Sequence, residues 1–121
     1  MRILHTSDWH LGRTFLSESM HSHQEVFVDW LLELVAIERV ELIVIAGDVY
    51  DRAVPPAESV RLFNRALVDV SAVCPVFVTP GNHDSAIRLG FGSELMRTNG
   101  VHIRSEISEI KIGLLITEEL K

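Results

Sequence analysis

Three short apolar runs, separated by two segments of helical periodicity, constrain the fold of this chain more than any other feature. The runs occupy residues 3–4, 42–46 and 76–78. Between them, apolar residues recur at the spacing of an amphipathic helix, first within 23–39 and then within 60–70. This β-α-β-α-β order indicates an α/β fold with a parallel sheet, right-handed crossovers and helices on both faces.

The pattern weakens after residue 84, although further elements can still be predicted. Residues 93–98 indicate a short helix and residues 101–103 another strand, while 112–116 form a last apolar run in a charged tail. Within the first helix we place Phe27 and Trp30 in the core stripe, and we expect Trp9 to pack beneath the loop that follows the first strand.

Composition excludes several classes of protein. Hydrophobic residues make up 47% of the 121 residues, which favours a globular domain over a disordered chain. No apolar run has the length of a signal peptide or of a membrane span, so we expect a cytoplasmic protein without a membrane partner. Cys74 is the only cysteine, which rules out an internal disulfide and suggests a small buried side chain.

The net charge of −6 argues against a generic basic nucleic-acid-binding module. It does not exclude an enzyme that acts on phosphates through metal ions. Carboxylates that bind a divalent cation are themselves negative, and the bound cation reverses the local field.

Polar side chains follow all three apolar runs, at the point where each strand should end. The segments are Ser7-Asp8-Trp9-His10, Gly47-Asp48-Val49-Tyr50-Asp51 and Gly81-Asn82-His83-Asp84. The carboxyl ends of parallel strands meet at one edge of a sheet, and there ligands bind. Asp8 and His10, two residues apart in an extended segment, should point the same way. Clustered carboxylates repel one another unless a cation lies between them, and mixed carboxylate, imidazole and amide ligands favour manganese, iron or zinc.

These segments resemble the first three motifs of the calcineurin-like metallophosphoesterases: DWH at 8–10, GDVYD at 47–51 and GNHD at 81–84. The wider stretches RILHTSDWHLGR, VIAGDVYDRAVPP and TPGNHDSAIRLGFGS resemble, more narrowly, the bacterial nuclease subunits of the SbcD type. The likeness extends over about residues 1–104 and implies the layered sheet of that superfamily.

The resemblance implies a site with two divalent metal ions, usually manganese. Asp8 and His10 would bind the first metal, Asp48 would bridge both, and Asn82 would bind the second. His83 matches the catalytic histidine of the family, which stabilises the transition state or protonates the leaving oxygen.

Asp51 matches a position at which many metallophosphoesterases carry an acid paired with that histidine. The resemblance therefore implies that Asp51 supports catalysis by orienting the ring of His83. It also implies a manganese-dependent DNA exonuclease or endonuclease that acts in recombination, repair and replication together with the ATPase subunit SbcC. A small-molecule phosphodiesterase or phosphatase of the same superfamily, and a non-catalytic metal-binding remnant, remain open.

The family's later histidine motifs have no counterpart here, because no histidine follows His102. We therefore expect residues 1–121 to be the N-terminal portion of a longer phosphoesterase domain, apparently truncated. Metal-dependent hydrolysis by these residues alone is expected to be weak or absent.

Overall fold

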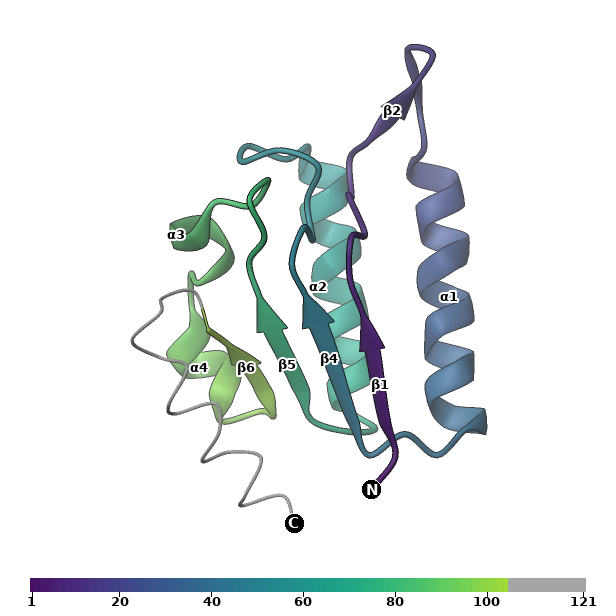
Figure 1. Ribbon diagram of the computed structural model, residues 1–121, viewed down its shortest axis with the longest axis vertical. Coiled ribbons are helices and arrows are strands. Elements are labelled where there is room, and N and C mark those ends of the chain that lie inside the picture. The colour runs from purple at the N-terminus through teal and green to yellow at the C-terminus, as the bar shows by residue number, and fades with distance from the viewer. Residues whose placement is uncertain (105–121) are drawn as a thin grey trace.

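The computed structural model describes residues 1–104 of the chain. Its centre is a parallel sheet with the strand order β1-β4-β5-β6, and two long helices run alongside the strands (Figure 1). The strands of this sheet are β1 (Ile3–Thr6), β4 (Leu42–Ala46), β5 (Val76–Thr79) and β6 (Val101–Ile103). The long helices are α1 (His21–Ile37) and α2 (Ala57–Ser71). A small hairpin is formed by β2 (Thr14–Phe15) and β3 (Glu18–Ser19). Two short helices, α3 (Ala86–Leu89) and α4 (Ser93–Arg97), lie between β5 and β6 in the chain.

The alternation of strands and helices predicted from the sequence is confirmed, including the short helix after residue 92 and the strand at 101–103. The apolar run at 112–116 lies outside the described residues. None of the helices within residues 1–104 combines the length and the apolar character that a membrane crossing requires.

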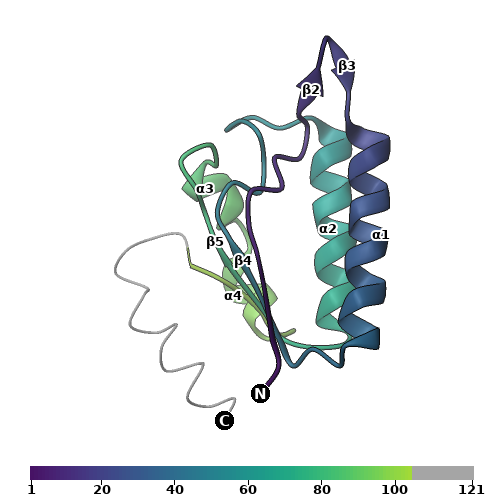
Figure 2. The ribbon, with the colours of Figure 1, turned by 45° about the vertical axis from the view of Figure 1, so that its right-hand side comes forward.

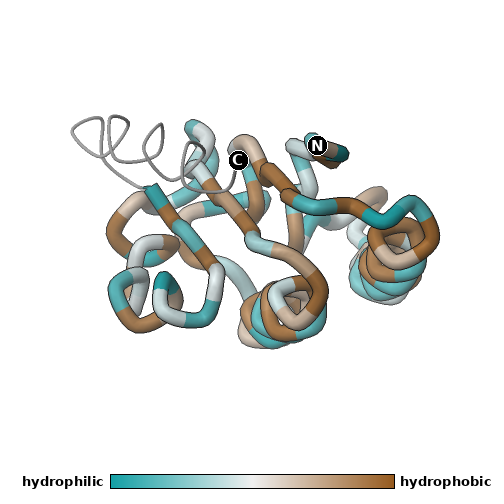
Figure 3. Tube along the Cα trace, turned by 90° about the horizontal axis from the view of Figure 1, so that it is seen from below, coloured by the Kyte–Doolittle hydropathy of each residue, from teal (hydrophilic) through white to brown (hydrophobic). Residues whose placement is uncertain are grey.

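Both long helices lie on the same face of the sheet. They stand side by side to one side of the strands when the molecule is turned (Figure 2), and each carries hydrophobic and hydrophilic residues (Figure 3). The strand order explains this arrangement. Each crossover moves to the next strand in the same direction, and successive right-handed crossovers in one direction place their helices on one face. The sequence predicted helices on both faces, whereas in the structure both long helices cover the same face (Figure 2).

The two faces of the sheet differ in burial accordingly. Ile43, Ile45, Val76 and Val78 are buried. The residues that follow them along the strands, Val44, Ala46, Phe77 and Thr79, point to the opposite face and are only partly buried. The core therefore lies between the sheet and the two long helices.

Trp9 links this core to the loop after β1. Its ring is 7% exposed and makes edge-to-face contacts with Phe27 of α1 and Phe63 of α2, at centroid distances of 5.3 and 5.9 Å. Its Nε1–H donates to the hydroxyl of Thr6 at 3.0 Å. The expected position of Trp9 beneath the loop is confirmed. Trp30, by contrast, is 53% exposed, so its placement in the core was wrong.

Candidate metal centre

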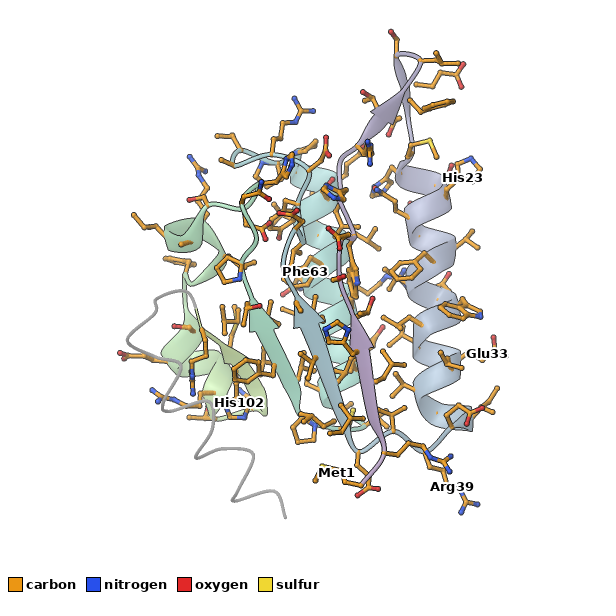
Figure 4. The ribbon with its side chains drawn as sticks, in the orientation of Figure 1. Met1, His23, Glu33, Arg39, Phe63 and His102 are labelled. Atoms are coloured by element: carbon orange, nitrogen blue, oxygen red, sulfur yellow. The ribbon has the colours of Figure 1, made fainter. Side chains whose placement is uncertain are left out.

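Polar side chains gather at the carboxyl ends of β1, β4 and β5. In Figure 4 nitrogen and oxygen atoms cluster above these strand ends, while the labelled Phe63 lies on α2 behind the sheet. Backbone hydrogen bonds hold the first two loops together beyond the strands: Asp8 N–H donates to Gly47 O at 3.1 Å and His10 N–H donates to Asp48 O at 2.9 Å. The loops that follow β1 and β4 therefore run side by side.

Asp8, His10 and Asp48 converge on one point. Nε2 of His10 lies 3.6 Å from Oδ1 of Asp8 and 3.9 Å from Oδ2 of Asp48. One possible ligand atom from each of the three residues lies within 4.8 Å of the other two, which is the grouping a single metal ion requires. Two carboxylates and an imidazole so placed suit a divalent transition metal.

The backbone at these three residues is unusual. Asp8, His10 and Asp48 have φ angles of +57°, +47° and +48°, in the left-handed region that residues other than glycine seldom adopt. Such conformations cost about 1–3 kcal/mol each and cluster at functional sites. They also correct the sequence argument. Asp8 and His10 converge because the chain turns after β1 ends at Thr6, and not because they alternate in an extended strand.

Asn82 comes from the loop after β5 and faces Asp48. In the orientation that forms hydrogen bonds, its NH₂ group lies 3.2 Å from both carboxylate oxygens of Asp48. The opposite orientation points Oδ1 of Asn82 at the same carboxylate, and a cation between them would be needed to offset the repulsion. Asn82 can therefore serve as a metal ligand next to Asp48 by rotation of its amide alone.

His83 lies beside the same carboxylate. Its backbone N–H donates to Oδ1 of Asp48 at 2.9 Å, and its ring meets that of His10 edge to face at 5.2 Å. Nδ1 of His83 lies 3.0 Å from the backbone carbonyl oxygen of Asp51. Since a carbonyl only accepts hydrogen bonds, this contact assigns the proton to Nδ1 and leaves Nε2 free in the neutral ring. His83 is exposed, so a substrate can reach its side chain.

The carboxylate of Asp51 contacts a different histidine. Its Oδ1 lies 3.2 Å from Nδ1 of His10, although the angle is not that of a hydrogen bond. Asp51 therefore contacts His83 through its carbonyl and His10 through its side chain, whereas the family resemblance implied a side-chain pairing with His83. His10, Asp51 and His83 form a second group with possible ligand atoms within 4.8 Å of one another.

Two residues that hold the loops were not identified from the sequence. Asp84 accepts hydrogen bonds from three backbone N–H groups: Oδ1 from Tyr50 at 2.8 Å, and Oδ2 from Gly81 at 2.9 Å and Val49 at 3.1 Å. Gln24 of α1 donates from Nε2 to His10 O at 2.9 Å and accepts from Gly12 N–H at 3.1 Å. Asp84 was visible only as one more acid at a strand end, and Gln24 gave no signal.

Burial and charge also affect Tyr50, next to the site. Burial, and secondly the negative charge of Asp84, raise the pKa of Tyr50 to about 12. Burial likewise raises the pKa of the Cys74 thiol, against a smaller opposing effect of a hydrogen bond with the backbone of Ile43. Cys74 is buried and unpaired, which confirms its expected structural role.

The structure thus brings all six predicted site residues together at one edge of the sheet. They are Asp8, His10, Asp48, Asp51, Asn82 and His83. Three carboxylates, two imidazoles and an amide are a donor set that suits manganese, iron or zinc, so the residues present fit the metal ions that the motifs imply.

Comparisons with known proteins agree with this geometry. The sequence matches the calcineurin-like phosphoesterase family over residues 1–115. It is 44% identical to the SbcD subunit of the nuclease SbcCD from Escherichia coli K12 over 97 residues, which are 79% of this chain and 24% of that protein. The protein of the same name from Bacillus subtilis is 43% identical over 105 residues, covering 85% and 27% of the two chains.

A third relative of that name, from Staphylococcus saprophyticus, is 33% identical over 112 residues, or 91% of this chain and 30% of its own. The chain therefore spans about a quarter of the length of the curated relatives it matches. With the family match covering nearly all of its residues and the motif side chains assembled at the sheet edge, the chain belongs to the calcineurin-like phosphoesterase family.

Proposed function

We propose that this chain forms part of the catalytic site of a manganese-dependent DNA nuclease of the SbcD type. The observation that carries the proposal is the convergence of Asp8, His10 and Asp48, with ligand atoms within 4.8 Å, on left-handed backbone. The similarity to nuclease subunits along most of the chain supports DNA as the substrate.

In this proposal Asp8 and His10 hold a first metal ion, Asn82 holds a second, and Asp48 bridges the two. The position of Asp48 supports a bridging role, because its carboxylate lies 3.9 Å from Nε2 of His10 and 3.2 Å from the amide of Asn82. Bound divalent ions would supply an activated water nucleophile and neutralise the charge that develops on the phosphate.

His83 is the proposed catalytic residue of the chain itself. Its Nδ1–H donates to the Asp51 carbonyl, and a second proton, on Nε2 of the imidazolium form, would donate to a phosphate oxygen or pass to the leaving oxygen. Asp51 supports catalysis through both rings, since it contacts His83 and His10. Its carboxylate would orient a metal-binding His10.

We further propose that the chain works with an ATPase subunit of the SbcC type, as the name SbcCD of its relatives suggests. In this proposal it acts on DNA in the cytoplasm, during recombination, repair and replication. In this proposal the relatives' additional length provides the remaining metal ligands.

The test uses the complete subunit, with His83→Ala compared with His23→Ala. The substitution at 83 keeps the backbone N–H that donates to Asp48, so metal binding should persist, whereas cleavage of linear duplex DNA should fall by about 10²–10⁴-fold. His23 is exposed on α1, outside the site, and its variant should cleave normally. Full activity of His83→Ala would contradict the assigned role. Cleavage of short nucleotide diesters but not of duplex DNA would instead favour a small-molecule phosphodiesterase.

A further inference from the structure

We infer that Asp84 is a positioning residue, which sets the spacing between the loop that carries Asp48 and the loop that carries Asn82. The inference rests on the proposed metal site, and it assigns to Asp84 a role that neither the motifs nor the comparisons supply. Its basis is the way in which hydrogen bonds between the three loops are distributed.

On the β1 side, a continuous series of backbone hydrogen bonds holds the loop at 47–51. In addition to the bonds from Asp8 and His10, Leu11 N–H donates to Val49 O at 2.9 Å and Asp51 N–H donates to Leu11 O at 3.1 Å. These bonds continue the pairing of β1 with β4 past the ends of both strands. The spacing of the loops after β1 and β4 is therefore set by backbone pairing.

On the β5 side, backbone pairing stops where the strands end. Ala46 of β4 and Thr79 of β5 are the last residues in register. Within the described residues, the last backbone hydrogen bond between β4 with its loop and β5 with its loop is the one that Gly47 N–H donates to Thr79 O at 2.9 Å. Beyond it, the carboxylate of Asp84 receives the N–H groups of Val49 and Tyr50 from one loop and of Gly81 from its own. Side chains thus replace the missing backbone hydrogen bonds: Asp84 with these three, and Asp48 with the one it accepts from His83 N–H at 2.9 Å.

This arrangement places Asp84 between predicted metal ligands without making it one of them. Its two oxygens accept three backbone hydrogen bonds, which occupy most of the acceptor capacity of a carboxylate. It belongs to neither group of possible metal ligands within residues 1–104. Its effect on a metal must therefore pass through the backbone, from Val49 to Asp48 on one side and from Gly81 to Asn82 on the other.

Hydrogen bonds to an ionised acceptor are stronger than those between neutral groups, so the negative charge of Asp84 matters as well as its shape. Asparagine has nearly the same shape but only one acceptor oxygen. In Asp84→Asn, an NH₂ group must face at least one backbone N–H, and donor then meets donor. The two loops should separate on that side although the rest of the fold is unchanged.

The experiment compares Asp84→Asn with Asp69→Asn in the complete subunit. Asp69 is exposed on α2, so it is a matched loss of one carboxylate away from the site. The first measurement is amide hydrogen exchange at Val49, Tyr50 and Gly81 without metal. The second is Mn²⁺ affinity by calorimetry, at a temperature at which circular dichroism shows each variant to be folded. A purely structural role would lower thermal stability and leave that affinity unchanged.

We expect Asp84→Asn to exchange these three amides faster and to bind Mn²⁺ about 10–100-fold more weakly, with both properties normal in Asp69→Asn. Unchanged exchange, or faster exchange with unchanged affinity, would overturn the inference. Absence of Mn²⁺ binding by the unmodified complete subunit would overturn the proposed metal site itself, and the positioning role with it. If Asp84→Asn does not fold, Asp84→Glu, which keeps the charge but displaces it by one methylene group, is measured in the same way with the same expected losses.

Discussion

A methyl group at Gly81 should disrupt the site and destabilise the fold at once. The loops after β4 and β5 approach so closely here that a Cβ on Gly81 would lie against the carboxylate oxygen and the backbone nitrogen of Asp48, and only 2.6 Å from its Cγ. Neither the Asp48 backbone, which pairs with the loop after β1, nor the root of its side chain can yield at low cost.

The magnitude follows from the contacts that must change. Overpacking of a rigid site costs about 1–3 kcal/mol, and a displaced Asp48 also loses the hydrogen bond from His83 N–H, which adds about 1 kcal/mol. We expect Gly81→Ala to lower the free energy of unfolding by about 3 kcal/mol, which for a domain of this size lowers the Tm by about 10 °C.

The assay is thermal unfolding followed by circular dichroism, with Gly90→Ala as the matched control. Gly90 has φ −79° and ψ −3°, a helical conformation that alanine adopts without strain, so its replacement should change stability by less than about 1 kcal/mol. A Gly81→Ala variant as stable as Gly90→Ala would refute the close approach of the two loops, and with it the geometry described for Asp48.

Two further predictions concern the aromatic residues beneath the loops. Trp9→Ala should lower the free energy of unfolding, measured with denaturant, by about 3–5 kcal/mol, because Trp9 is buried between Phe27 and Phe63. Trp30→Ala should lower it much less, since Trp30 is 53% exposed, and equal losses would contradict the packing. Tyr50 is the only tyrosine, so the ultraviolet absorbance of tyrosinate should report a pKa of about 12 in the folded chain and of about 10 in concentrated urea. Because the folded state holds this proton more tightly, the free energy of unfolding should fall as pH rises from 10.0 to about 12, and Tyr50→Phe should lack that portion of the decrease.

The order of strands and helices could be predicted because local periodicity reflects burial directly. The runs at 42–46 and 76–78 became neighbouring parallel strands, as their apolar character indicated. The coverage of one face by both long helices could not be predicted in this way, since it depends on strand order, a property of the whole sheet. Trp30 was wrongly placed in the core because helical periodicity does not define how wide the buried face of α1 is, and Trp30 lies at the exposed margin of that face.

The hairpin β2–β3 escaped prediction for a local reason. Its turn uses Leu16 and Ser17 with φ angles of +50° and +65°, and neither residue type signals the left-handed backbone that such a turn requires. The segment also lacks the asparagine or glycine that usually marks a two-residue hairpin loop.

The candidate site could be predicted as a set of side chains, because strand ends of a parallel sheet meet at one edge. Its backbone could not. The left-handed conformations at Asp8, His10 and Asp48 depend on hydrogen bonds between loops about 40 residues apart in sequence. Asp84 and Gln24 bind backbone groups of those loops, so their roles become visible only once the loops are in place.

The most direct test of the metal site is the location of bound Mn²⁺ by paramagnetic line broadening in NMR spectra of the chain. Amide signals of 8–10, 48–51 and 81–84 should broaden first as Mn²⁺ is added, and Asp48→Asn should abolish this effect. Broadening that instead centres on α1, where Nε2 of His21 and Oε1 of Glu25 lie 2.9 Å apart, and that persists in Asp48→Asn, would contradict the site at the carboxyl ends of the strands.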